Sequence, residues 1–251
     1  MSNNPIATTA RTNLLLGITG SVAAIKGPEI VVKLLSTQQY NIQVLLSEGG
    51  HHFWKKAPEY DSTYWSRFQS YMNNDNDDSD DNYLKIHTAQ DEWKNWNSMG
   101  DSVLHIELRN WADICVIAPL SAHTLAKIAN GLCDDTLSCV LRAWNFTTTS
   151  PATRIKPLIV APAMNTAMWD HPITQHQFQT IGNFFTIQPR HMTEDDDMTD
   201  IGSSAAGKLF HIIQPQVKTL ACGEIGSGAL ASVEDILTTI DQVRVAQQEY
   251  E

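Results

Sequence analysis

The segment "NLLLGITGSVAAIK", residues 13–26, contains the clearest evidence for the fold. Its first part, residues 13–19, is an apolar run typical of a buried strand. Gly20 then permits a tight turn, and Ser21 stands where a helix cap is expected. The N–H groups at the start of the next helix, around Val22, can hold an anion. The segment therefore predicts a strand, a turn and a helix start that could bind a charged ligand.

Two common phosphate-binding motifs do not match this turn. No Gly-Lys-Ser or Gly-Lys-Thr follows the strand, as a P-loop requires, and the GxGxxG pattern is missing as well. Taken alone, the turn is more often an ordinary helix cap without a ligand. Gly27 and Pro28 are expected to break or restart the helix, with Pro28 in its first turn.

The rest of the chain alternates between strand-like and helix-like segments. Further strand-like segments are 41–47, 113–119 and 156–162, with a weaker one at 184–189. Helix-like segments are 121–130, 135–144 and 233–248. This alternation predicts an α/β domain in which a parallel sheet carries helices on both faces and binds ligands at the carboxyl ends of its strands.

Length and composition fit one large domain. A chain of 251 residues with 42% hydrophobic residues can bury a full core. We expect a flexible N-terminus over residues 1–12 and a single domain over residues 13–248. The first residues are polar and contain no apolar stretch, so we expect neither a signal peptide nor a membrane span, and a cytoplasmic protein.

The net charge of -11 argues against nucleic acid as a partner, because phosphate binding needs clustered Lys and Arg and only 17 are present. Much of the acid lies in "NNDNDDSDDN" (73–82) and "TEDDDMTD" (193–200). Both segments lack apolar residues and predict solvated or disordered acidic insertions, at about 69–83 and 190–213.

An acidic protein that binds a phosphorylated ligand must rely on local backbone dipoles, because salt screens its overall field beyond roughly 10 Å. The helix start at Ser21 is one such place. A second follows "APLSAHT" (118–124), where Ser121 and Thr124 offer hydroxyl groups one helical turn apart.

Cysteine and histidine spacing predicts no structural or catalytic metal. The four cysteines, Cys115, Cys133, Cys139 and Cys222, form no CxxC pair, which in a chain of this size is typical of reduced thiols. The nine histidines include no HExxH.

Asn165 lies in "PAMNTAMW" (162–169), just past the carboxyl end of the predicted strand at 156–162. An amide at that place offers hydrogen-bond donors and an acceptor to a ligand at this edge of the sheet.

Five motifs in this order resemble one family. They are "GSVAAIK" (20–26), "VLHIELRNWAD" (103–113), "APLSAHTLAKIANGLCDD" (118–135), "PAMNTAMW" (162–169) and "ACGEIGSGALA" (221–231). Together they resemble the FMN-dependent cysteine decarboxylases, most closely the eukaryotic phosphopantothenoylcysteine decarboxylases of the Hal3 type. The resemblance covers about residues 13–240, apart from the two acidic insertions.

The resemblance implies a flavodoxin-like, doubly wound parallel sheet of the Rossmann type. It also implies a homotrimer, with FMN near the subunit contact and an active site completed by a neighbouring chain. The residues expected at the FMN phosphate are Gly20, Ser21 and Val22. Those expected at the flavin are Ser121, Ala122, His123, Thr124 and Ala163, with Ser47 and Phe53 as further contacts.

The implied reaction converts phosphopantothenoylcysteine to phosphopantetheine in coenzyme A biosynthesis. FMN takes a hydride from the carbon that bears sulfur, the resulting thioaldehyde loses carbon dioxide, and reduced flavin saturates the enethiol that remains. His105 is implied as the base and Cys222 as the proton donor. The implied substrate contacts are Asn165, Met164, Leu220 and Ala221. Without the family, His105 is equally well explained as a structural residue, and Cys222 is better explained as one.

This chain departs from the family at His123, where asparagine is usual, and at "CDD" (133–135), where CDN is usual. Three alternatives stay open: a peptidyl-cysteine decarboxylase, a flavin prenyltransferase, or a Hal3-like regulatory subunit that binds and inhibits a protein phosphatase. Because His105, Asn165 and Cys222 occur together, an enzyme is favoured.

Overall fold

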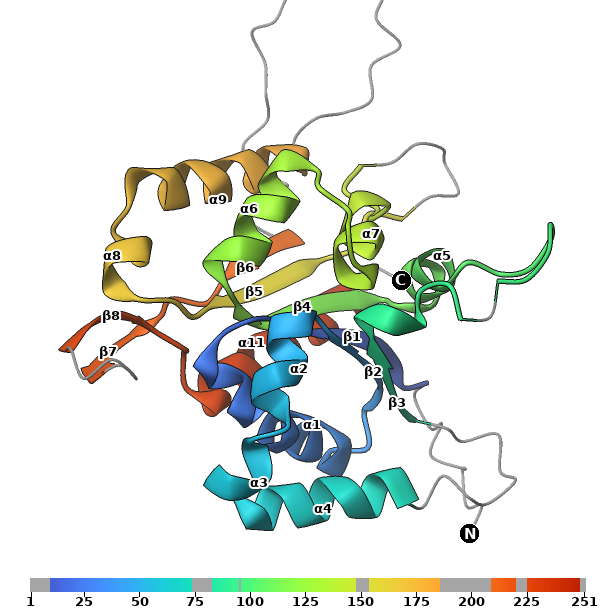
Figure 1. Ribbon diagram of the computed structural model, residues 1–251, viewed down its shortest axis with the longest axis horizontal. Coiled ribbons are helices and arrows are strands. Elements are labelled where there is room, and N and C mark those ends of the chain that lie inside the picture. The colour runs from blue at the N-terminus through green and yellow to red at the C-terminus, as the bar shows by residue number, and fades with distance from the viewer. Residues whose placement is uncertain are drawn as a thin grey trace, which may run out of the picture.

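A six-stranded parallel sheet forms the centre of the molecule (Figure 1). The computed structural model describes residues 10–73, 83–94, 96–147, 154–185, 209–219 and 225–248. The strand order is β3-β2-β1-β4-β5-β6. The strands are β1 (Thr12–Ile18), β2 (Tyr40–Leu46), β3 (Leu84–Thr88), β4 (Ile114–Leu120), β5 (Leu158–Pro162) and β6 (Phe210–Ile212). This arrangement confirms the predicted flavodoxin-like, doubly wound α/β fold.

Helices cover both faces of the sheet (Figure 1). One face carries α1 (Gly27–Ser36), α4 (Ser62–Asn73) and α11 (Val233–Gln248). The other carries α5 (Leu104–Trp111), α6 (Ala122–Asn130), α7 (Thr136–Arg142) and α9 (Pro172–Phe184). Because side chains alternate along a strand, Leu14 and Leu16 of β1 pack into the first core, and Leu15 packs into the second. Both sides of the central strands are therefore buried, which explains their continuous apolar sequence.

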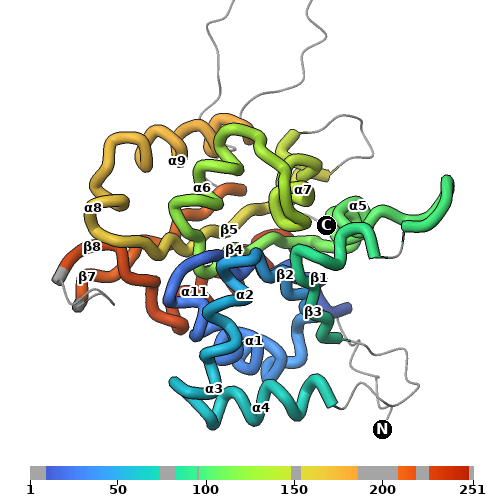
Figure 2. The backbone as a smooth tube through the Cα atoms, in the orientation of Figure 1, coloured from blue at the N-terminus to red at the C-terminus, as the bar shows by residue number. Residues whose placement is uncertain are grey.

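Short elements complete the carboxyl edge of the sheet. They are η1 (Val22–Lys26), α2 (Glu48–Trp54), α3 (Ala57–Tyr60), η3 (Ala89–Asp91), α8 (Thr166–Trp169) and an antiparallel ribbon of β7 (Gln216–Thr219) and β8 (Ile225–Ala229). The ribbon packs against α8 (Figure 2). A Cβ atom on Gly226 would lie only 2.0 Å from the Thr166 hydroxyl oxygen, so the ribbon approaches α8 as closely as glycine allows.

Most of the predicted elements are confirmed. The strands predicted at 13–19, 41–47, 113–119 and 156–162 correspond to β1, β2, β4 and β5. The helices predicted at 121–130, 135–144 and 233–248 correspond to α6, α7 and α11. As expected, α1 starts anew at Gly27 with a proline in its first turn.

The strand predicted at 184–189 is wrong where the structure describes it. Phe184 is the last residue of α9 and Phe185 is its C-cap. Phe185 is buried and packs against Phe146 and Phe210, so the apolar pair reflects burial at a helix end and not a strand. Residues 186–189 lie outside the described residues.

The two predicted acidic insertions are described only at their ends. Residues 69–73 form the last turns of α4, and residues 209–213 include the edge strand β6. The remaining residues of both ranges lie outside the described residues, as do residues 1–9. Within the described ranges, no helix is both long and apolar enough to cross a bilayer.

A substitution at Gly50 tests the close contact between α2 and the end of β1. A Cβ atom there would lie 2.1 Å from the Ile18 carbonyl oxygen, so Gly50→Ala should push α2 off the sheet and lower the free energy of unfolding by roughly 1–3 kcal/mol. The matched control is Gly182→Ala in α9, whose nearest neighbour would be a Phe210 ring atom at 3.7 Å. The control should be neutral or stabilise by roughly 0.5–1 kcal/mol. Urea unfolding followed by circular dichroism compares the two, and equal midpoints would contradict the described contact.

Candidate functional site

The strands β1 and β4 are neighbours whose following helices pack on opposite faces of the sheet. Their loops therefore diverge, and in doubly wound sheets ligands bind at this switch point. Thr19, fully buried, connects the two loops. Its hydroxyl donates to the Pro119 carbonyl oxygen at 2.7 Å and accepts from the Ser121 backbone N–H at 2.7 Å. Sequence analysis did not single out Thr19, although a polar residue at the end of an apolar run was a usable signal.

Backbone hydrogen bonds continue along this edge beyond the strands. They join Ser47 N–H to the Ile18 carbonyl, Thr19 N–H to Pro119, Ala163 N–H to Leu120, and Met164 N–H to Gly228, at 2.9–3.2 Å. The ends of β2, β1, β4, β5 and β8 are thus fixed in one row. A Cβ atom on Gly49 would lie 2.9 Å from the Gly20 Cα, so the β1 loop and the start of α2 meet backbone to backbone.

Four side chains in this row cap the helices that follow. Ser21 accepts from Ala23 N–H at 3.4 Å, Ser47 from Gly50 N–H at 3.1 Å, Ser121 from Thr124 N–H at 3.2 Å and Asn165 from Ala167 N–H at 2.8 Å. The first N–H groups of four helical segments thus meet one edge of the sheet, with α6 the longest of them. This edge favours an anionic ligand even though the chain as a whole is acidic.

The structure brings most of the predicted ligand residues together here. Gly20, Ser21 and Val22 follow β1, Ser47 and Phe53 lie at α2, Ser121 to Thr124 open α6, and Ala163, Met164 and Asn165 follow β5. Ser47, Ser121 and Thr124 are buried, and His123 is exposed. Ala163 is 2% exposed, and its backbone N–H donates to the Leu120 carbonyl at 3.0 Å. Leu220, Ala221 and Cys222 lie outside the described residues.

Asn165 uses its Oδ1 atom to cap α8. This bond fixes the orientation of the amide, so a carboxylate ligand would be met by the Nδ2 group, which is the donor. The geometry is compatible with the predicted carboxylate contact.

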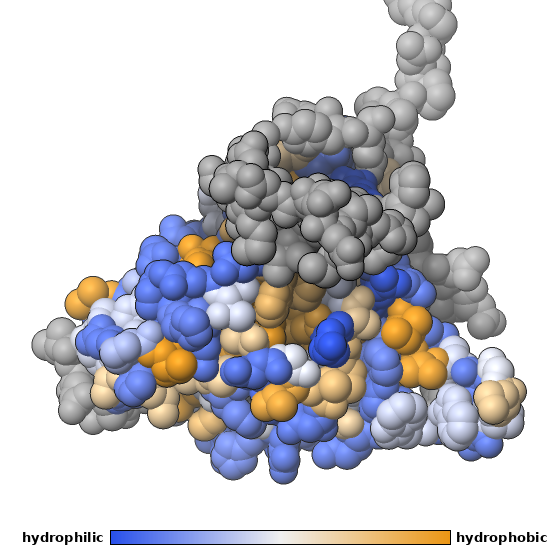
Figure 3. Space-filling model, turned by 90° about the horizontal axis from the view of Figure 1, so that it is seen from above, coloured by the Kyte–Doolittle hydropathy of each residue, from blue (hydrophilic) through white to orange (hydrophobic). Residues whose placement is uncertain are grey.

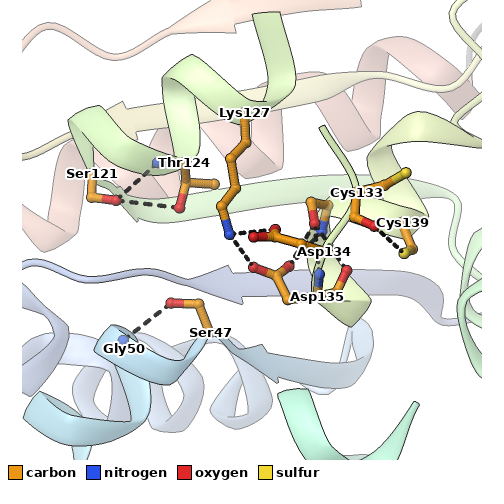
Figure 4. A network of polar contacts seen from close by, with 10 residues as sticks. Ser47, Gly50, Ser121, Thr124, Lys127, Cys133, Asp134, Asp135 and Cys139 are labelled. Atoms are coloured by element: carbon orange, nitrogen blue, oxygen red, sulfur yellow. Dashed lines mark hydrogen bonds and ion pairs between the residues drawn. The ribbon is translucent and has the colours of Figure 1, made fainter. Parts of the chain in front are cut away.

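A buried cation locks the loop between α6 and α7 (Figure 4). Lys127 is 7% exposed, and its Nζ atom lies 2.6 Å from Asp134 Oδ1 and 2.8 Å from Asp135 Oδ2. Burial lowers the pKa of Lys127, but its hydrogen bonds to the two carboxylates outweigh burial and raise the pKa above its usual value. The aspartate that replaces the usual asparagine of the family, Asp135, also caps α7.

His105 lies in the first turn of α5 and meets a buried acid. Its Nδ1 atom lies 2.5 Å from Oε1 of Glu92, which directly follows η3. Glu92 is 6% exposed, and the His105 side chain is 20% exposed. Sequence analysis missed Glu92 because no motif marked it.

His105 and Asn165 do not meet within one chain. Glu92 and His105 lie at the β3 end of the sheet, whereas Asn165 follows β5, four strands away in the order β3-β2-β1-β4-β5. Figure 1 shows α5 and α8 at opposite ends of the molecule.

A separate cavity of about 240 Å³ lies between α6, α7 and the end of α9. Its lining includes Ile128, Leu141, Phe146 and Phe184. Figure 3 views the molecule from above these helices and shows apolar residues along a hollow in that face. Because this cavity is smaller than the roughly 300–1,000 Å³ of ordinary ligand pockets and lies away from the capped helix starts, it is not the candidate site.

Thiol reactivity tests the packing around Glu92. Burial, followed by the nearby charge of Glu92, raises the pKa of the Cys139 thiol to about 11, and burial raises the pKa of Cys115 far above its usual range. At pH 8 only about one Cys139 thiol in a thousand should be ionised. Iodoacetamide should therefore label the exposed Cys133 first, as peptide mass spectrometry would show. Labelling of Cys139 should accelerate about tenfold per pH unit from pH 8 to 10, and equal labelling of Cys133 and Cys139 at pH 8 would contradict this environment.

Comparisons with known proteins agree with this arrangement. The flavoprotein family model matches residues 3–245. The soybean (Glycine max) protein phosphopantothenoylcysteine decarboxylase HAL3b is 37% identical over 227 residues, which cover 90% of this chain and 80% of the relative. A solved cysteine-to-serine mutant of PPC decarboxylase, complexed with pantothenoylaminoethenethiol, is 34% identical with a TM-score of 0.66 and covers 92% of this chain and 97% of its own. The FMN binding protein AtHal3 is 35% identical with a TM-score of 0.63, covering 92% of this chain and 96% of its own.

Proposed function

Because the chain belongs to the flavoprotein family and, within it, to the HAL3-type phosphopantothenoylcysteine decarboxylases, we propose that it binds FMN and converts phosphopantothenoylcysteine to phosphopantetheine. This reaction would make it an enzyme of coenzyme A biosynthesis. The proposal rests on the carboxyl edge of the sheet. There the starts of four helical segments lie around the switch point, each capped by a side chain, and one of these side chains is Asn165.

The residues at this edge fit FMN. Backbone N–H groups after Ser21 and Ser121 suit a phosphate, and the close approach of Gly20 and Gly49 keeps side chains away from the β1 loop. The half-buried ring of Phe53 offers apolar surface beside these polar groups. When bound, FMN would supply the two-electron oxidation and reduction that a saturated thiol cannot provide for itself.

The chain's own residues would bind the substrate and move protons. His105 would remove the thiol proton through Nε2, because its Nδ1 atom already meets Glu92. The Nδ2 group of Asn165 would donate to the carboxylate that leaves. Cys222 is proposed to return a proton to the enethiol. One relative was solved as a cysteine-to-serine mutant in complex with an ethenethiol compound, and this supports the proposed role of Cys222 as proton donor.

The site is proposed to form between chains of a homotrimer. His105 and Asn165 are separated by four strand spacings within one chain, so one active site that contains both must draw on two chains. Large apolar side chains that lie between Glu92 and His105 in the sequence support a subunit contact near these two residues. Trp93, Trp96 and Met99 are 62%, 43% and 95% exposed in the single chain.

Mixing two inactive variants tests this shared site. His105→Asn chains and Asn165→Asp chains, dissociated and reassembled at equal ratio with FMN, should regain about a quarter of native activity, because one adjacent pair in four then combines two native residues. The matched control mixes native chains with the double variant. That control should also give about a quarter if the site spans chains, but about half if each chain holds a whole site. No recovery in the first mixture together with half activity in the control would contradict a shared site.

Replacing Asn165 tests its contact with the carboxylate. Asn165→Asp keeps a good helix cap but places a second negative charge against the substrate, so KM should rise about tenfold or more while FMN stays bound. Asn165→Ser, which also caps, should weaken binding less. Activity on phosphopantothenoylcysteine is measured beside a cysteine-ended peptide, and turnover of the peptide alone would point to the peptidyl-cysteine reaction instead. A phosphatase regulator without catalysis would turn over neither.

A further inference from the structure

Glu92 is a buried acid with one recorded partner. Its Oε1 atom lies 2.5 Å from His105 Nδ1, and in the described part of the chain its buried Oε2 atom has no hydrogen-bond partner. Carboxylates are rarely buried unless they are paired, because burial removes their hydration. The contact with His105 is therefore what compensates for the burial of Glu92.

The local fold does not need Glu92. The neighbouring acid, Asp91, closes the capping box of η3, and its Oδ2 atom accepts from the Thr88 backbone N–H at 2.8 Å and from the Thr88 hydroxyl at 2.9 Å. Two adjacent acids thus have different partners. Asp91 stabilises its own turn, and Glu92 reaches across to α5.

We propose that Glu92 is a positioning residue that holds His105 in the tautomer with its proton on Nδ1. The inference rests on the proposed function, in which His105 is the base. An Nδ1–H group that donates to the carboxylate leaves Nε2 unprotonated, so Nε2 can accept the substrate's thiol proton. When that proton arrives, the imidazolium carries a positive charge beside the Glu92 carboxylate, and the pair is neutral overall. Carboxylate partners fix histidine tautomers in this way in other enzymes and metal sites.

The surroundings of Glu92 favour this role. The Cys139 thiol on α7 is close enough for the Glu92 charge to raise its pKa, and α5 packs against α7. Because Glu92 is only 6% exposed, water competes little for its hydrogen bond to His105.

A measurement without substrate tests the tautomer directly. Native protein labelled with ¹⁵N-histidine should show His105 protonated on Nδ1, with its signal assigned by its loss in His105→Asn. In Glu92→Leu, which removes the acceptor, the proton should move to Nε2 or divide between the two nitrogens. A native His105 protonated on Nε2, or an unchanged tautomer in Glu92→Leu, would overturn the proposal whether or not the protein is a decarboxylase.

A kinetic measurement tests the consequence for catalysis. Glu92→Gln keeps the size and an acceptor oxygen but loses the charge, so substrate-dependent flavin reduction should slow about 10²–10⁴-fold with FMN content and KM nearly unchanged. Glu92→Asp should recover part of that rate. The matched control, Asp91→Asn, should weaken the cap and lower the thermal midpoint while it keeps a rate within roughly threefold of native. A native rate in Glu92→Gln, or a loss of FMN and fold in it, would show that Glu92 is only structural. If native protein fails to turn over the substrate, the proposed function fails, and the tautomer measurement still decides the role of Glu92.

Discussion

One buried hydroxyl connects the two loops on which the candidate site is built. After β1 and β4 the backbone turns toward opposite faces of the sheet. The N–H and C=O groups just beyond the two strands therefore need hydrogen-bond partners. The Thr19 hydroxyl satisfies two of these groups at once, the Pro119 carbonyl and the Ser121 N–H. Without the hydroxyl the buried Ser121 N–H would lose its partner, which costs about 1–3 kcal/mol, whereas the Pro119 carbonyl would keep its bond from the Thr19 backbone N–H. The positions of Ser21 and Ser121, and of the helix starts they cap, follow from this bridge.

The same sheet that forms the ligand edge also separates the two proposed active-site residues, His105 and Asn165. Parallel strands place Asn165 and the loops after β1 and β4 along one row, but the position of β3 at the edge of the sheet carries Glu92 and His105 away from Asn165. One substrate cannot contact residues at both ends of a sheet of this width. The proposed subunit contact resolves this separation, because a neighbouring chain can present its His105 to this edge.

The sequence predicted the strands, helices and caps that depend on neighbouring residues, but it did not predict contacts between residues that are far apart in the chain. The strands β1, β2, β4 and β5 were recognisable because burial on one or both faces demands a dense apolar sequence, whereas β3 and β6 are short, half-buried edge strands with little contrast. The caps Ser21 and Ser121 were visible from their places after apolar runs. By contrast, Thr19 acts on residues about 100 positions away and Glu92 on a residue 13 positions away, and no local pattern encodes such contacts. The motif match implied the family's ligand residues and a site completed by a neighbouring chain, but it marked neither Thr19 nor Glu92.

We propose that the edge held by Thr19 is the FMN site. Titrating FMN into flavin-free protein, followed by the quenching of flavin fluorescence, tests it most directly in the native chain and in Thr19→Val, which keeps the shape but loses both hydrogen bonds. We expect saturation at about one FMN per chain, and binding about tenfold weaker or worse in Thr19→Val with its circular dichroism unchanged. Native protein that shows no saturable binding, or a Thr19→Val variant that binds FMN as tightly as native, would contradict it.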